Sequence, residues 1–183
     1  MMWRRVMAAG VTMVVSTALA ACSRPADTEG GRQPGGSSEV LRVVGPFELH
    51  SLDPARSEGF FTRMQVAETL VDADGQGVLR PGLATAWQVS TDQRTWTFAL
   101  RPDALFHDGT EVTAEAVAAS LKIARTEPGT PWGEAPVSAV TADGGQLRVE
   151  LDKPFAPLPA VLAHASTQVL APASYRPDQK VEK

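Results

Sequence analysis

The chain has 183 residues, of which 43% are hydrophobic and 21% are charged, and its formal net charge is −4. This mild acidity gives no reason to expect a nucleic acid partner. The fourteen prolines and fifteen glycines indicate many loops and short elements, more than a bundle of helices would contain.

Residues 1–21 are predicted to be a signal peptide. Two arginines near the start precede a mostly apolar stretch, 6–19, which is shorter than a permanent membrane span. The tetrad Leu19 to Cys22 resembles a bacterial lipobox, in which the cysteine is lipidated and becomes the first mature residue. Cys22 is the only cysteine, so an internal disulfide is impossible, and acyl chains there would hold the protein at a membrane surface. Ordinary secretory cleavage beside an incidental cysteine is the open alternative.

A flexible tether is expected next, over residues 22–39. This stretch is rich in Gly, Ser and Pro and has almost no apolar side chains, so it buries too little surface to become ordered. The apolar run 40–45 is typical of a strand. Asp53 stands before Pro54, a pair that favours a turn.

A helix is predicted over residues 62–71. Met64, Ala67 and Val71 recur at helical spacing, which places them on one face. Thr62 is the expected cap at its start.

Two β-hairpins are predicted further along the chain. The first joins residues 87–89 to 96–100, and the second joins residues 137–142 to 147–151. Alternating apolar and polar residues support both, and the second has Gly144 at its turn. A short helix is expected later, over residues 160–163.

The stretch 95–124 organises the chain as a strand, a tight loop and an amphipathic helix. Asp108 and Gly109 suit the loop, because aspartate bonds nearby backbone and glycine accepts a positive φ. Thr113 is the predicted N-cap of a helix of about three turns. Glu115 lies in its first turn, where the helix dipole favours a carboxylate.

The same residues carry a resemblance to a known family. The matching runs are Leu83-Ala84-x-x-Trp87, Trp96-Thr97-Phe98-x-Leu100-Arg101, Phe106-His107-Asp108-Gly109, Val112-Thr113-Ala114-Glu115-x-Val117 and Ser120-Leu121. Together they resemble the signature of the family 5 extracytoplasmic solute-binding proteins, which are the oligopeptide, dipeptide and nickel receptors of ABC importers. A later run, Ala171-Pro172 to Tyr175, is also similar to the family. The signature residues are expected to form core and turns and to identify the scaffold.

The resemblance implies an α/β fold, the amino-terminal part of a two-lobed, type II periplasmic-binding-protein-like fold with a mixed sheet and flanking helices. Family members are much longer, so residues 40–183 are expected to be a truncated amino-terminal third of the domain. In the family, two lobes close over a solute and deliver it to a permease that an ATPase drives.

The resemblance also implies the protein's location and partners. We expect a lipid-anchored monomer on the outer face of the bacterial cell membrane or in the periplasm. It would capture a peptide or a related small solute, contact ABC permease subunits and need no cofactor.

Three aromatic residues are candidates for contact with the solute. In the family, the segment after the first strand and its Leu-Asp-Pro turn passes close to the ligand, which makes Phe60 and Phe61 candidates, with core packing as the alternative. Trp132, in a loop rich in proline and glycine, is the third, with surface packing as its alternative. Nickel-type members carry arginines shortly before the Ala-Pro run, where this chain has residues 164–169. This departure weakens a nickel complex as the solute and leaves it open.

Enzyme chemistry has no support in the sequence. It contains no nucleophile-elbow, zinc-protease, phosphate-loop or C-x-x-C motif. His50, His107 and His164 are far apart in sequence and are expected in loops or turns and not at a metal. We expect a protein that is no enzyme, and the alternative function is a lipid-anchored scaffold or adhesion lipoprotein without a transported ligand.

Overall fold

The structure is a computed structural model of the chain, and it describes residues 49, 51–57, 59–178 and 180–181. The predictions for the signal peptide, Cys22, the tether and the strand at 40–45 lie outside these residues. No helix in the described part of the chain is long and apolar enough to cross a membrane.

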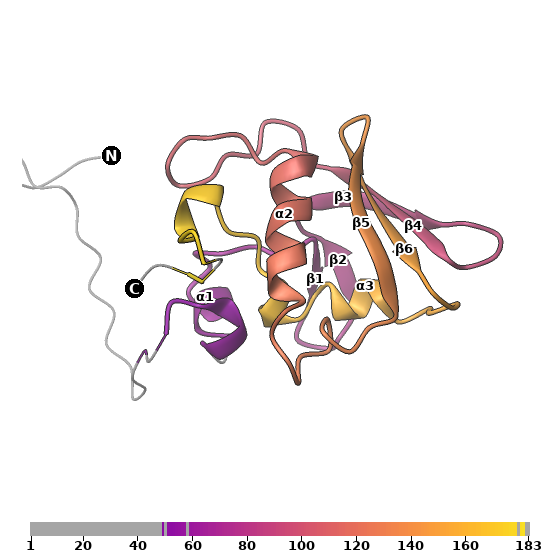
Figure 1. Cartoon of the computed structure of the whole chain (residues 1–183), viewed down its shortest axis with the longest axis horizontal. Coiled ribbons are helices and arrows are strands. Elements are labelled where there is room, and N and C mark those ends of the chain that lie inside the picture. The colour runs from indigo at the N-terminus through magenta and orange to yellow at the C-terminus, as the bar shows by residue number, and fades with distance from the viewer. Residues whose placement is uncertain (1–48, 50, 58, 179, 182–183) are drawn as a thin grey trace, which may run out of the picture. The chain divides into compact units, whose positions relative to one another are not determined.

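A four-stranded sheet with the strand order β3-β4-β6-β5 is the largest element of the fold (Figure 1). Its strands are β3 (Ala84–Val89), β4 (Thr95–Leu100), β5 (Val137–Asp143) and β6 (Gln146–Leu151). All of their pairings are antiparallel. Both predicted hairpins are confirmed. The second turns through Gly144 and Gly145 with φ of 55° and 82°, as a two-residue turn between twisted strands requires.

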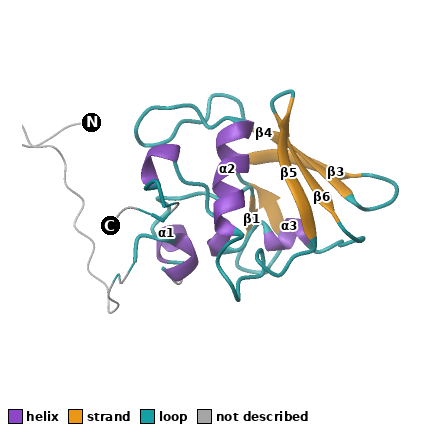
Figure 2. Ribbon diagram, in the orientation of Figure 1, coloured by secondary structure: helices purple, strands orange, loops and turns teal. Residues whose placement is uncertain are grey.

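Helix α2 (Ala114–Ala124) packs on one face of this sheet, against β5 and β6 (Figure 2). The Thr113 side chain accepts a hydrogen bond from a backbone N–H in the first turn, which confirms the predicted cap. Val117 and Leu121, one turn apart, are fully buried. They share a core with Phe98 of β4 and Val149 of β6. The apolar stripe of the helix and the inward face of the sheet therefore bury one another.

The predicted helix over residues 62–71 is wrong. Helix α1 (Phe60–Arg63) has only four residues, and Gly59, not Thr62, precedes it. Gln65 has a φ of 54°, in the left-handed region that a right-handed helix cannot continue through.

The end of that predicted helix is a strand instead. β1 (Val71–Ala73) pairs antiparallel with β2 (Leu79–Pro81) in a separate two-stranded sheet. Leu70 and Val71 are fully buried. Of the three residues that suggested a helical face, only Val71 belongs to the core, and it does so from extended backbone. Tertiary packing outweighs local helix propensity here.

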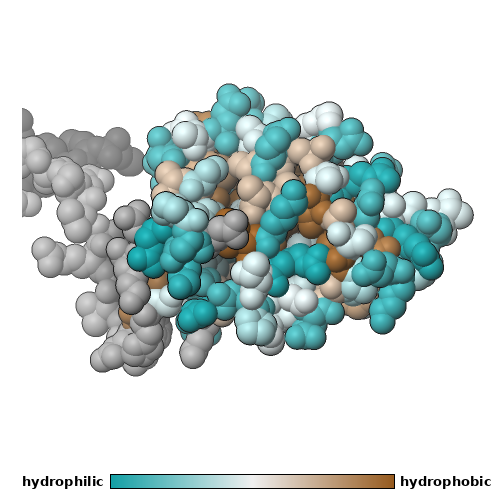
Figure 3. Space-filling model, viewed as in Figure 1, coloured by the Kyte–Doolittle hydropathy of each residue, from teal (hydrophilic) through white to brown (hydrophobic). Residues whose placement is uncertain are grey.

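Short helices complete the fold. They are the 3-10 helices η1 (Pro54–Arg56), η2 (Ala165–Thr167) and η3 (Pro172–Ser174) and the α-helix α3 (Leu158–Val161). Helix α3 starts and ends two residues before the predicted range 160–163. The Asp53 side chain caps η1 by accepting a hydrogen bond from the backbone at 2.9 Å, so the turn predicted before Pro54 is present. Figure 3 shows hydrophilic side chains over much of the viewed face, with hydrophobic ones between them.

Candidate functional site

A cavity of about 390 Å³ lies between segments that are far apart in the sequence. Its lining comes from residues 51–54 and 56, from the end of α2 and the turn after it, from Ser166 and Gln168, and from residues 175–176, 178 and 180–181. A volume of this size suits a small solute. The cavity exists only because folding brings both ends of the described chain together.

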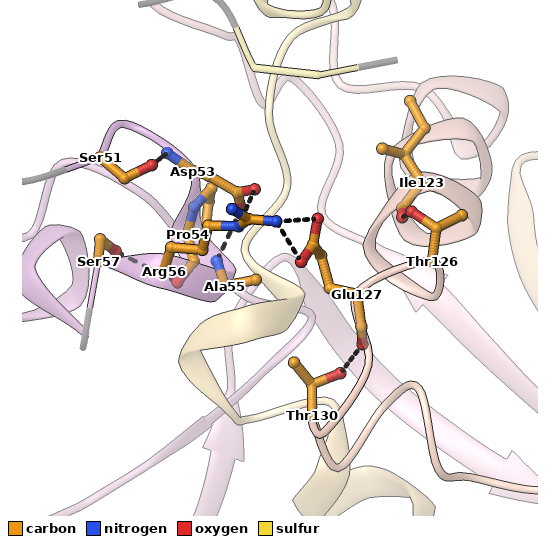
Figure 4. A network of polar contacts seen from close by, with 10 residues as sticks. All are labelled: Ser51, Asp53, Pro54, Ala55, Arg56, Ser57, Ile123, Thr126, Glu127 and Thr130. Carbon is orange, nitrogen blue, oxygen red and sulfur yellow. Dashed lines mark hydrogen bonds and ion pairs between the residues drawn. The ribbon is translucent and has the colours of Figure 1, made fainter. Parts of the chain in front are cut away.

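An ion pair between Arg56 and Glu127 ties two of these segments to each other (Figure 4). Arg56 Nη2 donates to both carboxylate oxygens of Glu127, at 3.1 and 3.3 Å. The Asp53 carboxylate lies on the other side, 3.8 Å from Arg56 Nε. Thr130 Oγ1 donates to the backbone carbonyl of Glu127 at 3.1 Å. One guanidinium is therefore held by two carboxylates at this side of the cavity.

Gln168 lines the same cavity although only 2% of the residue is exposed. Its Nε2 donates to Thr62 Oγ1. Its Oε1 is buried and has no hydrogen-bond partner within the described part of the chain. A buried acceptor without a partner costs about 1–3 kcal/mol, and such atoms are rare in native proteins.

Tyr175 connects the carboxy-terminal segment to α2 beside the cavity. Its hydroxyl lies 2.8 Å from Ser120 Oγ, which also accepts a hydrogen bond from the Leu170 backbone N–H at 3.2 Å. Burial raises the pKa of the Tyr175 phenol, the nearby Asp53 charge raises it further, and the hydrogen bond to Ser120 partly opposes this rise. The net shift is upward, so this hydroxyl stays protonated and neutral at neutral pH.

The aromatic pair predicted to contact the solute lies in α1, next to the cavity in sequence but outside its lining. Phe60 and Phe61 are half-buried, and their rings meet edge to face with centroids 5.5 Å apart. Thr62, the next residue, is the one that holds the Gln168 carboxamide. Solute contact by the two phenylalanines stays a prediction.

Trp132, the third predicted contact, lies in the core. None of it is exposed, and its Nε1 donates to the Leu121 carbonyl of α2 at 2.8 Å. In this structure the ring has no solvent-facing surface from which to contact a solute.

Gln168 and the Arg56 to Glu127 pair were absent from the sequence prediction. The only sequence signal for Gln168 was its place in the stretch 164–169, where the family resemblance predicts arginines in nickel-type members. Nothing in the local sequence indicates that its carboxamide is buried, because that burial depends on residues far along the chain.

Within the described residues, histidine and acidic side chains do not gather around a metal position. No three His, Cys, Asp or Glu side chains form such a group among the residues that the structure describes. His107 and His164 are both exposed, and His164 Nδ1 lies 2.9 Å from Ser166 Oγ. His50 lies outside the described residues.

Comparison with known proteins identifies relatives of one kind. The profile of the bacterial extracellular solute-binding proteins, family 5 (middle region), matches residues 78–183, which is more than half of the chain. The periplasmic oligopeptide-binding protein OppA of Haemophilus influenzae is 43% identical over 70 residues, 37% of this chain and 13% of that protein. The nickel-binding periplasmic protein of Escherichia coli is 38% identical over 79 residues, 43% of this chain and 14% of that protein. The chain thus spans a small part of the length of these relatives.

Solved structures show the same likeness. The nickel ABC transporter protein from Bacillus halodurans matches with a TM-score of 0.60 and 31% identity, over 73% of this chain and 28% of that one. This likeness confirms the predicted fold class, the α/β fold of the type II periplasmic binding proteins. The relatives reported above are named for binding or transport, which confirms the prediction of a binding protein that is no enzyme at the level of the family.

Proposed function

Because the chain belongs to the bacterial extracellular solute-binding proteins of family 5, we propose that it captures a peptide or a related small solute for an ABC importer. The observation that carries this proposal is the cavity of about 390 Å³ with paired charges in its lining. Such a lining holds a solute by hydrogen bonds and charge without reacting with it. The partner is an ABC permease, which the protein meets as a monomer.

The charges around the cavity favour a peptide as the solute. Asp53 and Glu127 share the single guanidinium of Arg56, which leaves an excess of carboxylate at η1. Arg176 and Lys180 lie 3.9 and 3.7 Å from the single carboxylate of Asp178, which leaves an excess of cation there. A short peptide carries an ammonium, a carboxylate and amide groups between them, and it complements both ends.

A nickel complex is the second candidate solute. It is favoured by the match to the nickel-binding protein of Escherichia coli at 38% identity. Against it stands Gln168, in the stretch where nickel-type receptors carry arginines.

Titration of the purified chain with trialanine, and separately with the nickel complex of histidine, distinguishes these solutes. We expect saturable binding of trialanine with a Kd on the order of 1 mM, about −4 kcal/mol, because the charged groups of this cavity are partly exposed and already paired with one another. Saturation by the nickel complex alone would assign the second candidate. Saturation by neither would favour the alternative of a lipid-anchored scaffold that carries no ligand.

We also propose that residues 1–21 are removed and that Cys22 is acylated, with residues 22–39 as the tether of the binding domain, 40–183. The support is the lipobox-like tetrad that ends at Cys22. Cells that express the chain should incorporate radiolabelled palmitate into it, and Cys22→Ser should remove the label. An unlabelled wild-type chain would refute lipid anchoring and leave the proposed solute binding untouched.

A further inference from the structure

We propose that the loop of residues 101–112 is a docking surface for a partner protein that presents cationic side chains beside an apolar one. On the proposed function this partner is the ABC permease, and the inference rests on the proposed function for that identity alone. The loop connects β4 to α2 and lies outside the lining of the solute cavity. Its surface combines an exposed leucine, two hollows and an excess of carboxylate.

Leu105 is the apolar centre of this docking surface. It is 62% exposed, more than any other large hydrophobic residue in the described part of the chain. Two hollows of about 600 and 360 Å³ adjoin it, and Leu105 and Val112 line both. Most residues around the smaller hollow are apolar, and Val66 among them is also exposed. Exposed apolar side chains that gather in this way are typical of an interaction site.

The loop holds Leu105 outward in a fixed conformation. Leu105 pairs with Glu111 in an antiparallel bridge, and the Phe106 N–H donates to the Thr110 carbonyl at 2.8 Å. Phe106 packs against the core, and successive side chains of extended backbone point to opposite sides. A partner therefore meets a preformed surface, which lowers the entropic cost of binding.

The charges around Leu105 decide which kind of partner fits. Asp103, Glu111 and Glu115 line the larger hollow and are exposed. None of the three has an ion-pair partner among the residues that the structure describes. Arg101, the cation of the same hollow, is already bound to Glu68 by two hydrogen bonds of 2.9 and 3.1 Å. The remaining carboxylates attract cationic groups and repel anionic ones.

The same charges disfavour two other occupants of the surface. Anionic lipid headgroups would be repelled by the carboxylates. A second copy that docked through the same loop would bring like charges together, and the whole chain has a net charge of −4. A segment with lysine or arginine beside an apolar side chain complements both the hollows and the carboxylates.

Titration of the isotopically labelled chain with acetyl-Leu-Lys-Ala-Lys-Leu-amide, followed by backbone chemical shifts, tests the inference. This peptide is blocked at both ends, so it lacks the charged termini that are proposed to bind in the solute cavity. We expect saturable shifts of the Leu105 and Glu111 amides, and weaker binding when the salt concentration rises from about 50 to about 500 mM. An acidic twin, with glutamate in place of both lysines, should leave these amides unshifted.

Variants of the loop supply the second readout. Leu105→Ser and Glu111→Gln should raise the Kd for the basic peptide by about tenfold and about threefold. Both positions are exposed, so the thermal midpoint should change little. The matched controls are Val78→Ser and Glu134→Gln, at exposed positions outside both hollows, and they should leave the Kd unchanged.

Three outcomes would overturn the inference. The acidic twin could bind as tightly as the basic peptide, Leu105→Ser could bind the basic peptide as the wild type does, or the basic peptide could shift no amide of the loop. A chain that binds the basic peptide but not trialanine would instead remove the proposed solute function, and the permease as the named partner, while the docking surface would stand.

Discussion

Trp132 acts as a core residue because the fold buries it, although its residue type would also suit contact with a solute. Its indole is fully buried and donates to the Leu121 carbonyl, so it fastens the loop after α2 to the helix. An aromatic residue in a loop of prolines and glycines could equally have faced a solute, and only the fold distinguishes the two.

Trp132→Phe should lower the free energy of unfolding by about 2 kcal/mol, because it removes a buried hydrogen bond and leaves a smaller ring in the core. Denaturant unfolding measures this change. The matched control is Trp87→Phe at a half-buried position on β3, expected to cost less. Equal losses for the two variants would contradict the assignment of Trp132 to the core.

Tyr175 is the only tyrosine in the sequence, so phenolate absorbance reports on it alone. Burial raises its pKa in the folded chain, and the absorbance titration should have its midpoint above the value of about 10 for an unperturbed tyrosine. In denaturant the midpoint should return to about 10.

The raised Tyr175 pKa has a consequence for stability. The folded chain holds the phenol proton more tightly than the unfolded chain, so this contribution is complete below about pH 10 and is lost as the pH rises through the folded pKa. Tyr175→Phe should therefore lose less stability than the wild type above about pH 10. Parallel stability profiles of the two chains across that range would contradict this.

Among the secondary-structure elements, the ones that the sequence predicts well are those whose conformation depends on neighbouring residues: α2, the turn before it and the two hairpins. Thr113 caps α2, and Gly109 takes a φ of 83° in the predicted turn, because each conformation is set by neighbouring residues. The hairpins are equally local, since alternation and the residues of the turn fix their register.

Strand β1 could not be predicted in this way. Its first residue, Val71, fits a helical period with Met64 and Ala67, yet the backbone takes a positive φ at Gln65 and residues 71–73 pair with β2. The Leu83 and Ala84 N–H groups donate to the carbonyls of Thr69 and Leu70, at 3.0 and 2.9 Å. These hydrogen-bond partners lie more than ten residues apart in the sequence, so the local spacing of apolar residues could not predict the pairing.

Gly82 lies where the chain passes close to the backbone of Thr69 and Leu70, and a substitution there tests how close that approach is. A Cβ on Gly82 would lie 2.6 Å from the Thr69 carbonyl oxygen, so Gly82→Ala should destabilise the chain by about 1–3 kcal/mol as the backbone shifts. Thermal or denaturant unfolding measures the loss. Gly75→Ala is the control, since a Cβ there meets no atom within 4 Å, and a loss as large at Gly75 would contradict the steric explanation.

At the scale of the whole molecule, the family and fold class were predictable, and the cavity was not. The signature residues are core and turn residues that neighbours in sequence identify. Arg56, Glu127 and Gln168 come from three separate segments, and their proximity is a product of the fold alone. The three aromatic contacts were predicted from the resemblance alone. A resemblance can place a segment near a solute, but it does not say which side chain of that segment touches the solute.

We propose that this chain forms one wall of a cavity that captures a solute and that it performs no reaction on the solute. Chemical-shift mapping of the isotopically labelled chain during a titration with trialanine measures both properties. We expect concentration-dependent shifts of the backbone amides of Arg56, Glu127 and Gln168, with the peptide intact at the end. Shifts confined to surfaces away from these residues, or cleavage of the peptide, would contradict it.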